Sequence, residues 1–398
     1  MGGLTYSSNG STNFHLNGGA VQIAESFVSP IARKIELQAN GGTLDLAEGV
    51  ELTLTGDIHG VGALTKAGAG KLTLTANNSY TGGTTISAGT LVLSENGALG
   101  TGAVVNNAAL VFANDSDQTF NNAVSGTGAV TKTGSGTLSL TNANSYEGGT
   151  TISAGTLVLS ENGTLGTGAV IDNATLVFAH DSDQTFNNAV SGTGTVSKTG
   201  AGKLKIDATE NLFQSSQFTV EAGELDFKGN YSGNLYVKSG ATLSPGNSVG
   251  DLAVSGNVVI DDNGTILFEF GSYNNGSTSQ NYDTLAITNA DDEFSLDTGS
   301  IVKLFFEGND ASVWAADNAE YLLVSDPGFV SEETSFNSLL GNYQDLFGLQ
   351  GRADGLYLVS LGVGPGPSPD PGSGVPEPST WALLALGVVV LFLRKRKN

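Results

Sequence analysis

Residues 68–133 read GAGKLTLTANNSYTGGTTISAGTLVLSENGALGTGAVVNNAALVFANDSDQTFNNAVSGTGAVTKT, and residues 134–199 follow at once as GSGTLSLTNANSYEGGTTISAGTLVLSENGTLGTGAVIDNATLVFAHDSDQTFNNAVSGTGTVSKT. The period of the repeat is therefore 134 − 68 = 66, and the two copies differ at 13 positions. Residues 51–67 align with residues 117–133 as a partial earlier copy, and a new copy starts at Gly200 before the similarity decays. Self-similarity at a fixed period is typical of a solenoid, in which each unit buries its hydrophobic face on the next.

A shorter spacing inside each copy indicates how the chain coils. Leu72, Leu91 and Leu110 are evenly spaced (91 − 72 = 19 and 110 − 91 = 19), in short alternating strands separated by Gly or Asn. About 20 residues with three strands is the size of one coil of a parallel β-helix, whose coils stack roughly 4.8 Å apart. The sequence therefore predicts an all-β fold, a right-handed parallel β-helix (β-solenoid) in which one copy makes about three coils.

The composition agrees with this interpretation and excludes several classes. The chain has 398 residues with 56 Gly, 9 Pro and no Cys, and 39% of its residues are hydrophobic. Gly follows no three-residue period, so the chain is not collagen, and the hydrophobic content excludes disorder. The formal net charge of −23 would repel phosphate backbones, which excludes nucleic-acid binding. The absence of Cys excludes disulfides and thiolate chemistry.

The motif SYTGGTTISAGTLVL, found at residues 79–93 and nearly unchanged at 145–159, has two interpretations. Coil stacking explains most of its positions, because Gly suits tight corners and alternating apolar residues suit an internal ladder. The alternative is a repeated recognition surface. We expect the structural role.

A resemblance to a known family rests on these residues. GAGKLTLTANNSYTGGTTISAGTLVL at residues 68–93 resembles the autotransporter-associated β-strand repeat of large bacterial surface proteins, and residues 134–159 resemble it again. LSPGNSVGDL at residues 243–252 is similar to the strand-and-turn element that closes such passenger regions. The resemblance implies a β-helix displayed outside the cytoplasm, and it implies no particular activity.

The remaining chain is predicted to form three further regions after a solenoid over residues 1–252. Residues 253–361 contain β-type runs and are expected to cap the last hydrophobic coil, with a short helix from Ser335 to Phe347. Residues 362–374, GVGPGPSPDPGSG, form a Pro/Gly linker. Residues 375–398 form a tail.

The tail contains three elements in a fixed order: Val375-Pro376-Glu377-Pro378, an apolar run over residues 381–393, and the basic cluster Arg394-Lys395-Arg396-Lys397. Although this apolar run is short for a bilayer, its terminal position and the four bases favour a short transmembrane helix with its basic end in the cytoplasm. This end resembles the PEP-CTERM sorting signal. The resemblance implies an exosortase-type membrane enzyme as partner, which would recognise and cleave near Pro376–Pro378.

The location expected from this tail is export with transient inner-membrane anchoring, followed by the periplasm, cell surface or extracellular matrix of a Gram-negative bacterium. An exported chain should begin with a basic and then an apolar segment, and Met1–Tyr6 shows neither. We therefore expect the natural start to lie further upstream.

Candidate chemistry is sparse. Asp115, Asp117, Asp181 and Asp183 occupy one position of the repeat, so a stacked acidic stripe with a weak Ca²⁺ site is one interpretation. Solvated turns are the alternative, and we favour them. The three histidines, His15, His59 and His180, are isolated in the sequence and are expected at the surface. We assign no catalytic residue, no cofactor and no metal.

Two functions remain. The first is a structural or adhesion-type surface β-helix without enzymatic activity. The second is a β-helix that binds or degrades polysaccharide, with exopolysaccharide or another surface component as its partner. A binding or cleaving solenoid should show a groove lined by aromatic or clustered charged residues, whereas a stalk should show uniform Thr, Ser and Asn faces.

Overall fold

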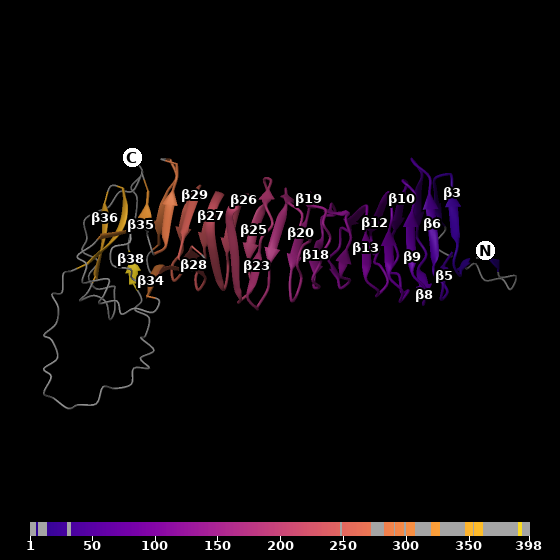
Figure 1. Cartoon of the computed structure of the whole chain (residues 1–398), viewed down its shortest axis with the longest axis horizontal. Helices are drawn as coiled ribbons and strands as arrows, with labels where there is room; N and C mark the ends of the chain where they lie inside the picture. The colour runs from indigo at the N-terminus through magenta and orange to yellow at the C-terminus, as the bar shows by residue number, and fades with distance from the viewer. Residues whose placement is uncertain are drawn as a thin grey trace, which may run out of the picture. The chain divides into compact units, whose positions relative to one another are not determined.

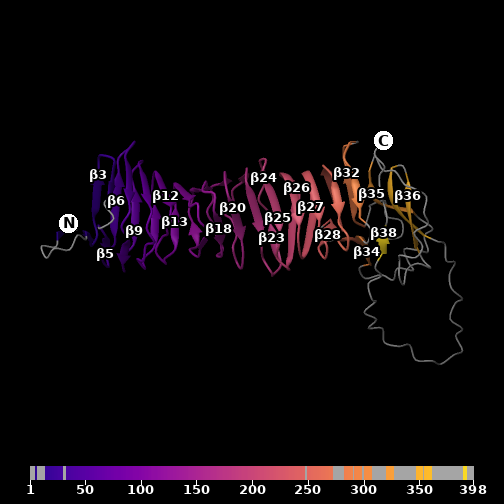
Figure 2. The same ribbon diagram turned by 180° about the vertical axis from the view of Figure 1, so that it is seen from behind.

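The computed structural model describes residues 5–6, 14–29, 33–246, 249–271, 282–289, 291–297, 300–306, 320–326, 347–352, 354–360 and 389–391. All regular structure in these ranges is β. The chain forms two compact units, the first comprising residues 1–182 and 187–197, and the second residues 183–186 and 198–398. Each is a stack of parallel strands, which confirms the predicted β-solenoid; Figures 1 and 2 show the strands of the first unit from indigo to magenta.

The first unit has three faces, each a stack of parallel strands from successive coils. Face 1 consists of β4 (Phe27–Ser29), β7 (Glu51–Leu54), β10 (Lys71–Leu74), β12 (Thr90–Ser94), β14 (Ala109–Ala113), β17 (Ala129–Lys132), β19 (Thr150–Ile152), β21 (Val170–Asp172) and β24 (Val190–Ser191). Face 2 consists of β3 (Ala20–Ile23), β6 (Gly42–Leu46), β9 (Leu64–Ala67), β11 (Thr84–Ile86), β13 (Val104–Asn106) and β16 (Val124–Ser125).

Face 3 consists of β2 (Phe14–Leu16), β5 (Ile35–Leu37), β8 (Ile58–Gly60), β15 (Gln118–Phe120), β18 (Thr137–Leu140), β20 (Thr156–Leu159), β22 (Thr175–Phe178) and β25 (Thr195–Lys198), whose last residue belongs to the second unit. Between β8 and β15 two coils pass this face without a named strand, held where Ser79 N donates to Ile58 O and Thr101 N donates to Tyr80 O. β1 (Thr5–Tyr6) pairs antiparallel with β2.

The alternation of apolar and polar residues sets which side chains enter the core. In β10 Leu72 and Leu74 are buried, whereas Thr73 between them faces outward. Strand pairing then places Leu72 next to Leu91 and Leu91 next to Leu110. The regular interval between these leucines in the sequence is therefore one coil, as predicted.

One copy of the repeat makes more than the predicted three coils. On face 1 the paired residues Lys71, Thr90, Ala109 and Ala129 mark three coils, and 129 − 71 = 58 is less than the period of the repeat. The rest of the copy leads the chain around one more corner to β18 on face 3. Each new copy is therefore shifted by one face.

The second unit is also built mainly from stacked parallel strands, some of which are longer. It consists of β23 (Gln184–Phe186), β26 (Lys203–Val220), β27 (Glu224–Val237), β28 (Thr242–Pro245), β29 (Asp251–Ser255), β30 (Val258–Ile260), β31 (Thr265–Phe270), β32 (Thr284–Ile287), β33 (Phe294–Leu296), β34 (Ser300–Phe306), β35 (Glu320–Ser325), β36 (Phe347–Arg352), β37 (Gly355–Ser360) and β38 (Val389–Leu391). β27 pairs along its length with β28, β29 and β30 in turn, so it runs across three faces.

Beyond residue 252 parallel pairing persists between β29 and β32, β30 and β33, and β31 and β34. β35, β37 and β36 then form an antiparallel sheet, and β38 pairs antiparallel with β34. The predicted helix over residues 335–347 and the linker over residues 362–374 lie outside the described residues. The domain boundaries of the sequence analysis stay predictions.

Candidate functional site

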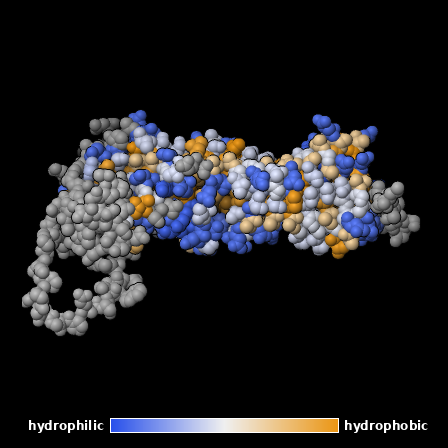
Figure 3. Space-filling view, in the orientation of Figure 1, coloured by the Kyte–Doolittle hydropathy of each residue, from blue (hydrophilic) through white to orange (hydrophobic). Residues whose placement is uncertain are grey.

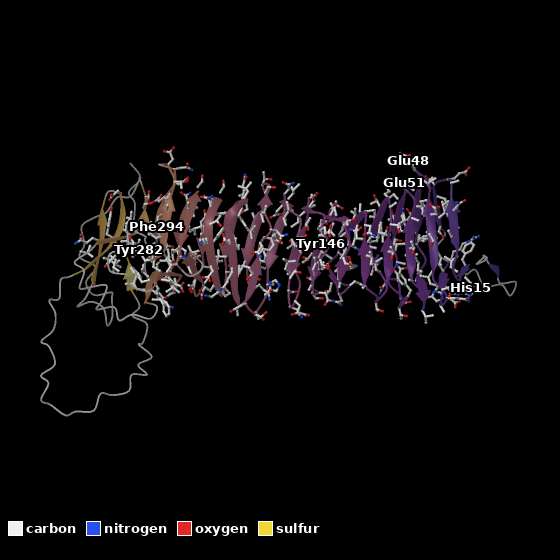
Figure 4. The ribbon with its side chains drawn as sticks, in the orientation of Figure 1. His15, Glu48, Glu51, Tyr146, Tyr282 and Phe294 are labelled. Atoms are coloured by element: carbon white, nitrogen blue, oxygen red, sulfur yellow. The ribbon has the colours of Figure 1, made fainter. Side chains whose placement is uncertain are left out.

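The aromatic side chains of the repeat lie inside the coils. Tyr80 and Tyr146 are 0% and 1% exposed, and their hydroxyls lie 2.6 and 2.7 Å from the Oγ1 atoms of Thr84 and Thr150 (Figure 4 labels Tyr146). Burial raises the pKa of both hydroxyls. The other aromatic side chains of residues 68–199 are buried too, namely Phe112, Phe120, Phe178 and Phe186. No ring of the two copies is therefore available to stack on a ligand.

The central outward positions of face 1 form an uncharged ladder, next to the exposed ion pair of Lys71 and Glu51. The ladder residues, paired from one coil to the next, are Thr53, Thr73, Val92, Val111, Thr131, Thr151 and Ile171. β-branched side chains suit a pleated, half-buried surface. Figure 3 shows much of this unit's visible surface at intermediate hydropathy. Val and Ile therefore share the outer positions with the predicted Thr and Ser.

The four candidate Ca²⁺ ligands do not form a stripe. Asp115 Oδ1 accepts hydrogen bonds from the N–H of Ser135 at 2.8 Å and from its hydroxyl at 3.0 Å, and Asp117 Oδ1 accepts one from Thr137 N at 2.8 Å. These bonds lower the pKa of Asp115 and Asp117. The next coil, 20 residues further along the chain, places Ser135 and Thr137 beside these two aspartates.

The other two aspartates, Asp181 and Asp183, follow β22 at a different corner, where Asp183 Oδ1 accepts a hydrogen bond from Lys203 N at 2.9 Å. The four aspartates therefore lie at two different corners and do not form the stacked acidic stripe, which was the less favoured interpretation. Throughout the part of the chain that the structure describes, no three His, Cys, Asp or Glu side chains are grouped so as to hold a metal ion.

Three lysines are buried, which was not predicted from the sequence. Lys66, Lys132 and Lys198 each precede a Gly-x-Gly corner and are at most 2% exposed. Lys66 Nζ donates to Gly68 O at 2.7 Å and to Ala88 O at 3.1 Å, and Lys198 Nζ donates to Ala222 O at 3.0 Å. Lys132 Nζ donates to the carbonyl of Gly134. The recurring Lys-x-Gly-x-Gly pattern was the signal that could have identified them.

These lysines connect one corner to the next coil, because each ammonium group donates hydrogen bonds to backbone carbonyls of both. Burial lowers the pKa of Lys66 and Lys132, and the carboxylates of Asp45 and Asp115 respectively oppose the shift. Hydrogen bonds to a charged group are worth about 1.5–3 kcal/mol, which offsets part of the cost of burying the ammonium. The lysines are therefore structural.

The histidines are not equivalent. His180 is 6% exposed, and its Nε2 lies 2.7 Å from Gly163 O, so the expectation that it lies at the surface was wrong. Its counterpart Asn114 donates from Nδ2 to Gly97 O at 3.3 Å, so the two residues contact the equivalent buried corner carbonyl in each copy. His15 and His59, in contrast, lie on the outer side of face 3 with Glu36 between them.

The second unit has a charged outer surface on β26 and β27. Lys203, Lys205 and Asp207 pair across the strands with Glu224, Asp226 and Lys228, so each rung joins opposite charges. Lys203 Nζ lies 2.7 Å from Glu224 Oε1 and 3.3 Å from Asp226 Oδ2. Burial raises the pKa of Asp226, and the Lys203 ammonium opposes the shift. Charged side chains are therefore clustered at this pair of strands, although Asp226 is only 2% exposed.

The sorting residues Val375–Pro378 and Arg394–Lys397 lie outside the described residues, as does the predicted membrane segment apart from Val389–Leu391. Within the described ranges no helix has the length and apolar character needed to cross a membrane.

The coil geometry and the repeat define a β-solenoid. The family model described as passenger-associated-transport-repeat matches residues 64–93 and 130–159, and the PEP-CTERM protein-sorting motif matches residues 374–397. The chain is also similar to the adhesin BmaC autotransporter of Brucella suis biovar 1 (strain 1330), with 38% identity over 86 residues. That match covers 21% of this chain and 2% of the relative.

The chain thus carries autotransporter-associated repeats followed by a C-terminal PEP-CTERM sorting motif. These features identify an exported protein of the cell envelope or surface of Gram-negative bacteria. The motif also implies processing by an exosortase-type membrane enzyme.

Proposed function

We propose that this chain is a structural, adhesion-type β-helix of the cell surface or extracellular matrix, and that it is not an enzyme. The observation that carries the proposal is the burial of the aromatic side chains of residues 68–199, which leaves the central outward positions of face 1 to Thr, Val and Ile. A regular column of uncharged β-branched side chains suits a stalk whose sequence is dictated by coil stacking. The relative from Brucella suis is named as an adhesin, which supports the same function.

The proposed route to the surface uses the tail. Val375, Pro376, Glu377 and Pro378 serve as the recognition residues of the exosortase-type enzyme, and Arg394–Lys397 stay on the cytoplasmic side. The tail anchors the chain in the inner membrane until it is cleaved. None of these residues performs chemistry.

A second candidate function is binding or cleavage of a polysaccharide. The charged cluster of Lys203, Glu224 and Asp226 favours it, because such sites need several charged groups on one face. Each of these charges already has a partner of opposite sign, so the cluster also serves as a cross-strand pairing of β26 and β27.

The two functions differ in a binding experiment on the purified chain. A glycan array should show no saturable binding, while beads coated with the chain should attach to cells that display it. Saturable binding to one class of polysaccharide that is lost in Lys203→Ala would contradict the first function and support the second. Lys71→Ala, which removes an exposed lysine paired with Glu51, is the matched control.

A further inference from the structure

Two histidines and a glutamate form a single ladder near the start of the first unit. Strand pairing sets His15 of β2 beside Glu36 of β5, and Glu36 beside His59 of β8. All three face outward and are partly exposed, since the side chains of His15, Glu36 and His59 are 22%, 35% and 31% exposed. Figure 4 labels His15 near the N-terminal end of the ribbon.

Both imidazoles turn their Nδ1 atoms toward carboxylates. His15 Nδ1 lies 2.7 Å from Glu36 Oε2, and His59 Nδ1 lies 3.5 Å from Asp57 Oδ2. Among the described residues neither Nδ1 atom has a partner in hydrogen-bond geometry, although both atoms are buried. Both ring nitrogens thus face carboxylate oxygens, that of His15 at ion-pair distance and that of His59 further away.

We propose that His15, Glu36 and His59 bind a divalent transition-metal ion of the Zn²⁺ type. At a strand spacing of roughly 4.8 Å the backbones of His15 and His59 stand roughly 10 Å apart, with the carboxylate between them. Imidazole nitrogen and carboxylate oxygen are preferred Zn²⁺ ligands, and three protein ligands leave a fourth position for water. The parallel strands hold the three groups in register.

Binding requires one side chain to move. No three ligand groups of the described chain already converge on one point, so the His59 ring must turn from Asp57 toward Glu36. This is a rotamer change of a partly exposed side chain. Asp57 keeps a partner, because its Oδ1 lies 2.8 Å from Lys34 Nζ.

The repeat predicts one such site per chain. Position 59 corresponds to Ser125 and Ser191 in the two later copies, so the ladder is not repeated with them. The same comparison supplies a substitution that the coil accepts, His59→Ser. It also supplies a control, His180→Asn, which introduces the residue that the first copy has at position 114.

The test is titration of the full-length chain, purified in detergent, with ZnCl₂ by calorimetry, together with Co²⁺ absorption to report the ligand geometry. We expect one saturable ion per chain. His59→Ser and Glu36→Gln should each weaken binding at least 10-fold, because a ligand lost from a three-ligand site leaves too few donors. His180→Asn should bind as the unsubstituted chain does.

Three results would overturn the site. The first is the absence of saturable binding by the unsubstituted chain. The second is an affinity in both ladder variants that equals that of the unsubstituted chain. The third is loss of binding in His180→Asn. Circular dichroism of each variant verifies the β-fold. Glu36→Gln changes a single exposed group, so it decides the question if His59→Ser lowers the stability of the coil.

Discussion

Leu140 lies on a different face of the first unit from Leu74, although the two hold the same position in successive copies of the repeat. Leu74 lies on face 1 between Leu54 and Leu93, whereas Leu140 lies on face 3 between Phe120 and Leu159. The cause is the length of the coil, because three coils on face 1 end before one full copy of the repeat is complete.

This shift places equivalent residues of the two copies on different faces. Asp115 follows β14 on face 1, whereas its counterpart Asp181 follows β22 on face 3. The aspartates of the two copies therefore do not share one corner of the solenoid.

The buried lysines should contribute measurably to stability. Lys132→Met keeps the aliphatic stem but removes the ammonium that bonds the carbonyls of Gly134 and Ala154. We expect a loss of about 1–3 kcal/mol from buried carbonyls left unpaired, measured by urea denaturation. Lys71→Met, at an exposed pair with Glu51, should change stability by less than about 0.5 kcal/mol. If Lys132→Met is as stable as the unsubstituted chain, the free-energy cost of burying the ammonium equals the stabilisation from its hydrogen bonds, which would contradict this prediction.

The glycine of the next coil that lies beside a buried lysine should not tolerate a side chain. Gly155 has a φ of +69°, and a Cβ there would lie 2.5 Å from Gly134 O and 2.7 Å from Lys132 Nζ. Gly155→Ala should therefore lower the urea midpoint clearly. Gly49→Ala is the control, since Gly49 has a φ of +77° but open space around a Cβ. It should cost only the backbone strain of about 1–2 kcal/mol, and Gly155→Ala about 1–3 kcal/mol more. Similar losses in both variants would argue against the tight corner.

Asp172 should make the first unit less stable as the pH rises. It is 1% exposed, its Oδ1 accepts a hydrogen bond from Ala174 N at 3.1 Å, and burial raises its pKa to about 6. The folded chain therefore holds a proton that the unfolded chain releases near pH 4, so stability falls between about pH 4 and pH 6 and then levels off.

Asp172→Asn should remove that dependence, because the first copy carries Asn106 at this position and its Nδ2 donates to Ala129 O. At pH 7 the variant should be more stable by about 1–3 kcal/mol, a range that allows for partial solvent screening. Urea midpoints at pH 4, 5, 6 and 7 check this. Parallel curves for both proteins would show that Asp172 does not titrate on unfolding.

Much of the fold followed from local pattern. The interval from Leu72 to Leu91 predicted the coil, and strand pairing joins these residues directly. Alternation within each strand predicted which leucines enter the core. The exact number of coils in one copy could not be predicted, because sequence similarity does not fix the lengths of the corners. Near-identical copies also suggest that equivalent residues lie on the same face.

Two groups of side chains with a proposed functional or structural role were not predicted from the sequence, for different reasons. Lysine is rarely buried unless it is paired, so Lys132 was not predicted to lie inside the coil. His15 and His59 belong to different coils, and only the pairing of each with Glu36 brings them together. Their proximity depends on coil length, which the sequence outside the repeat does not specify.

Cysteine pairs test the coil register most directly, and the chain has no cysteine of its own. Val111 and Thr131 are partners on neighbouring strands of face 1, so Val111→Cys with Thr131→Cys should oxidise to a disulfide, seen as a loss of free thiols and confirmed by peptide mass. Thr73 and Ser139, which hold the same place in successive copies, should stay reduced when both are Cys. A disulfide between positions 73 and 139, with free thiols at 111 and 131, would contradict the coil described above.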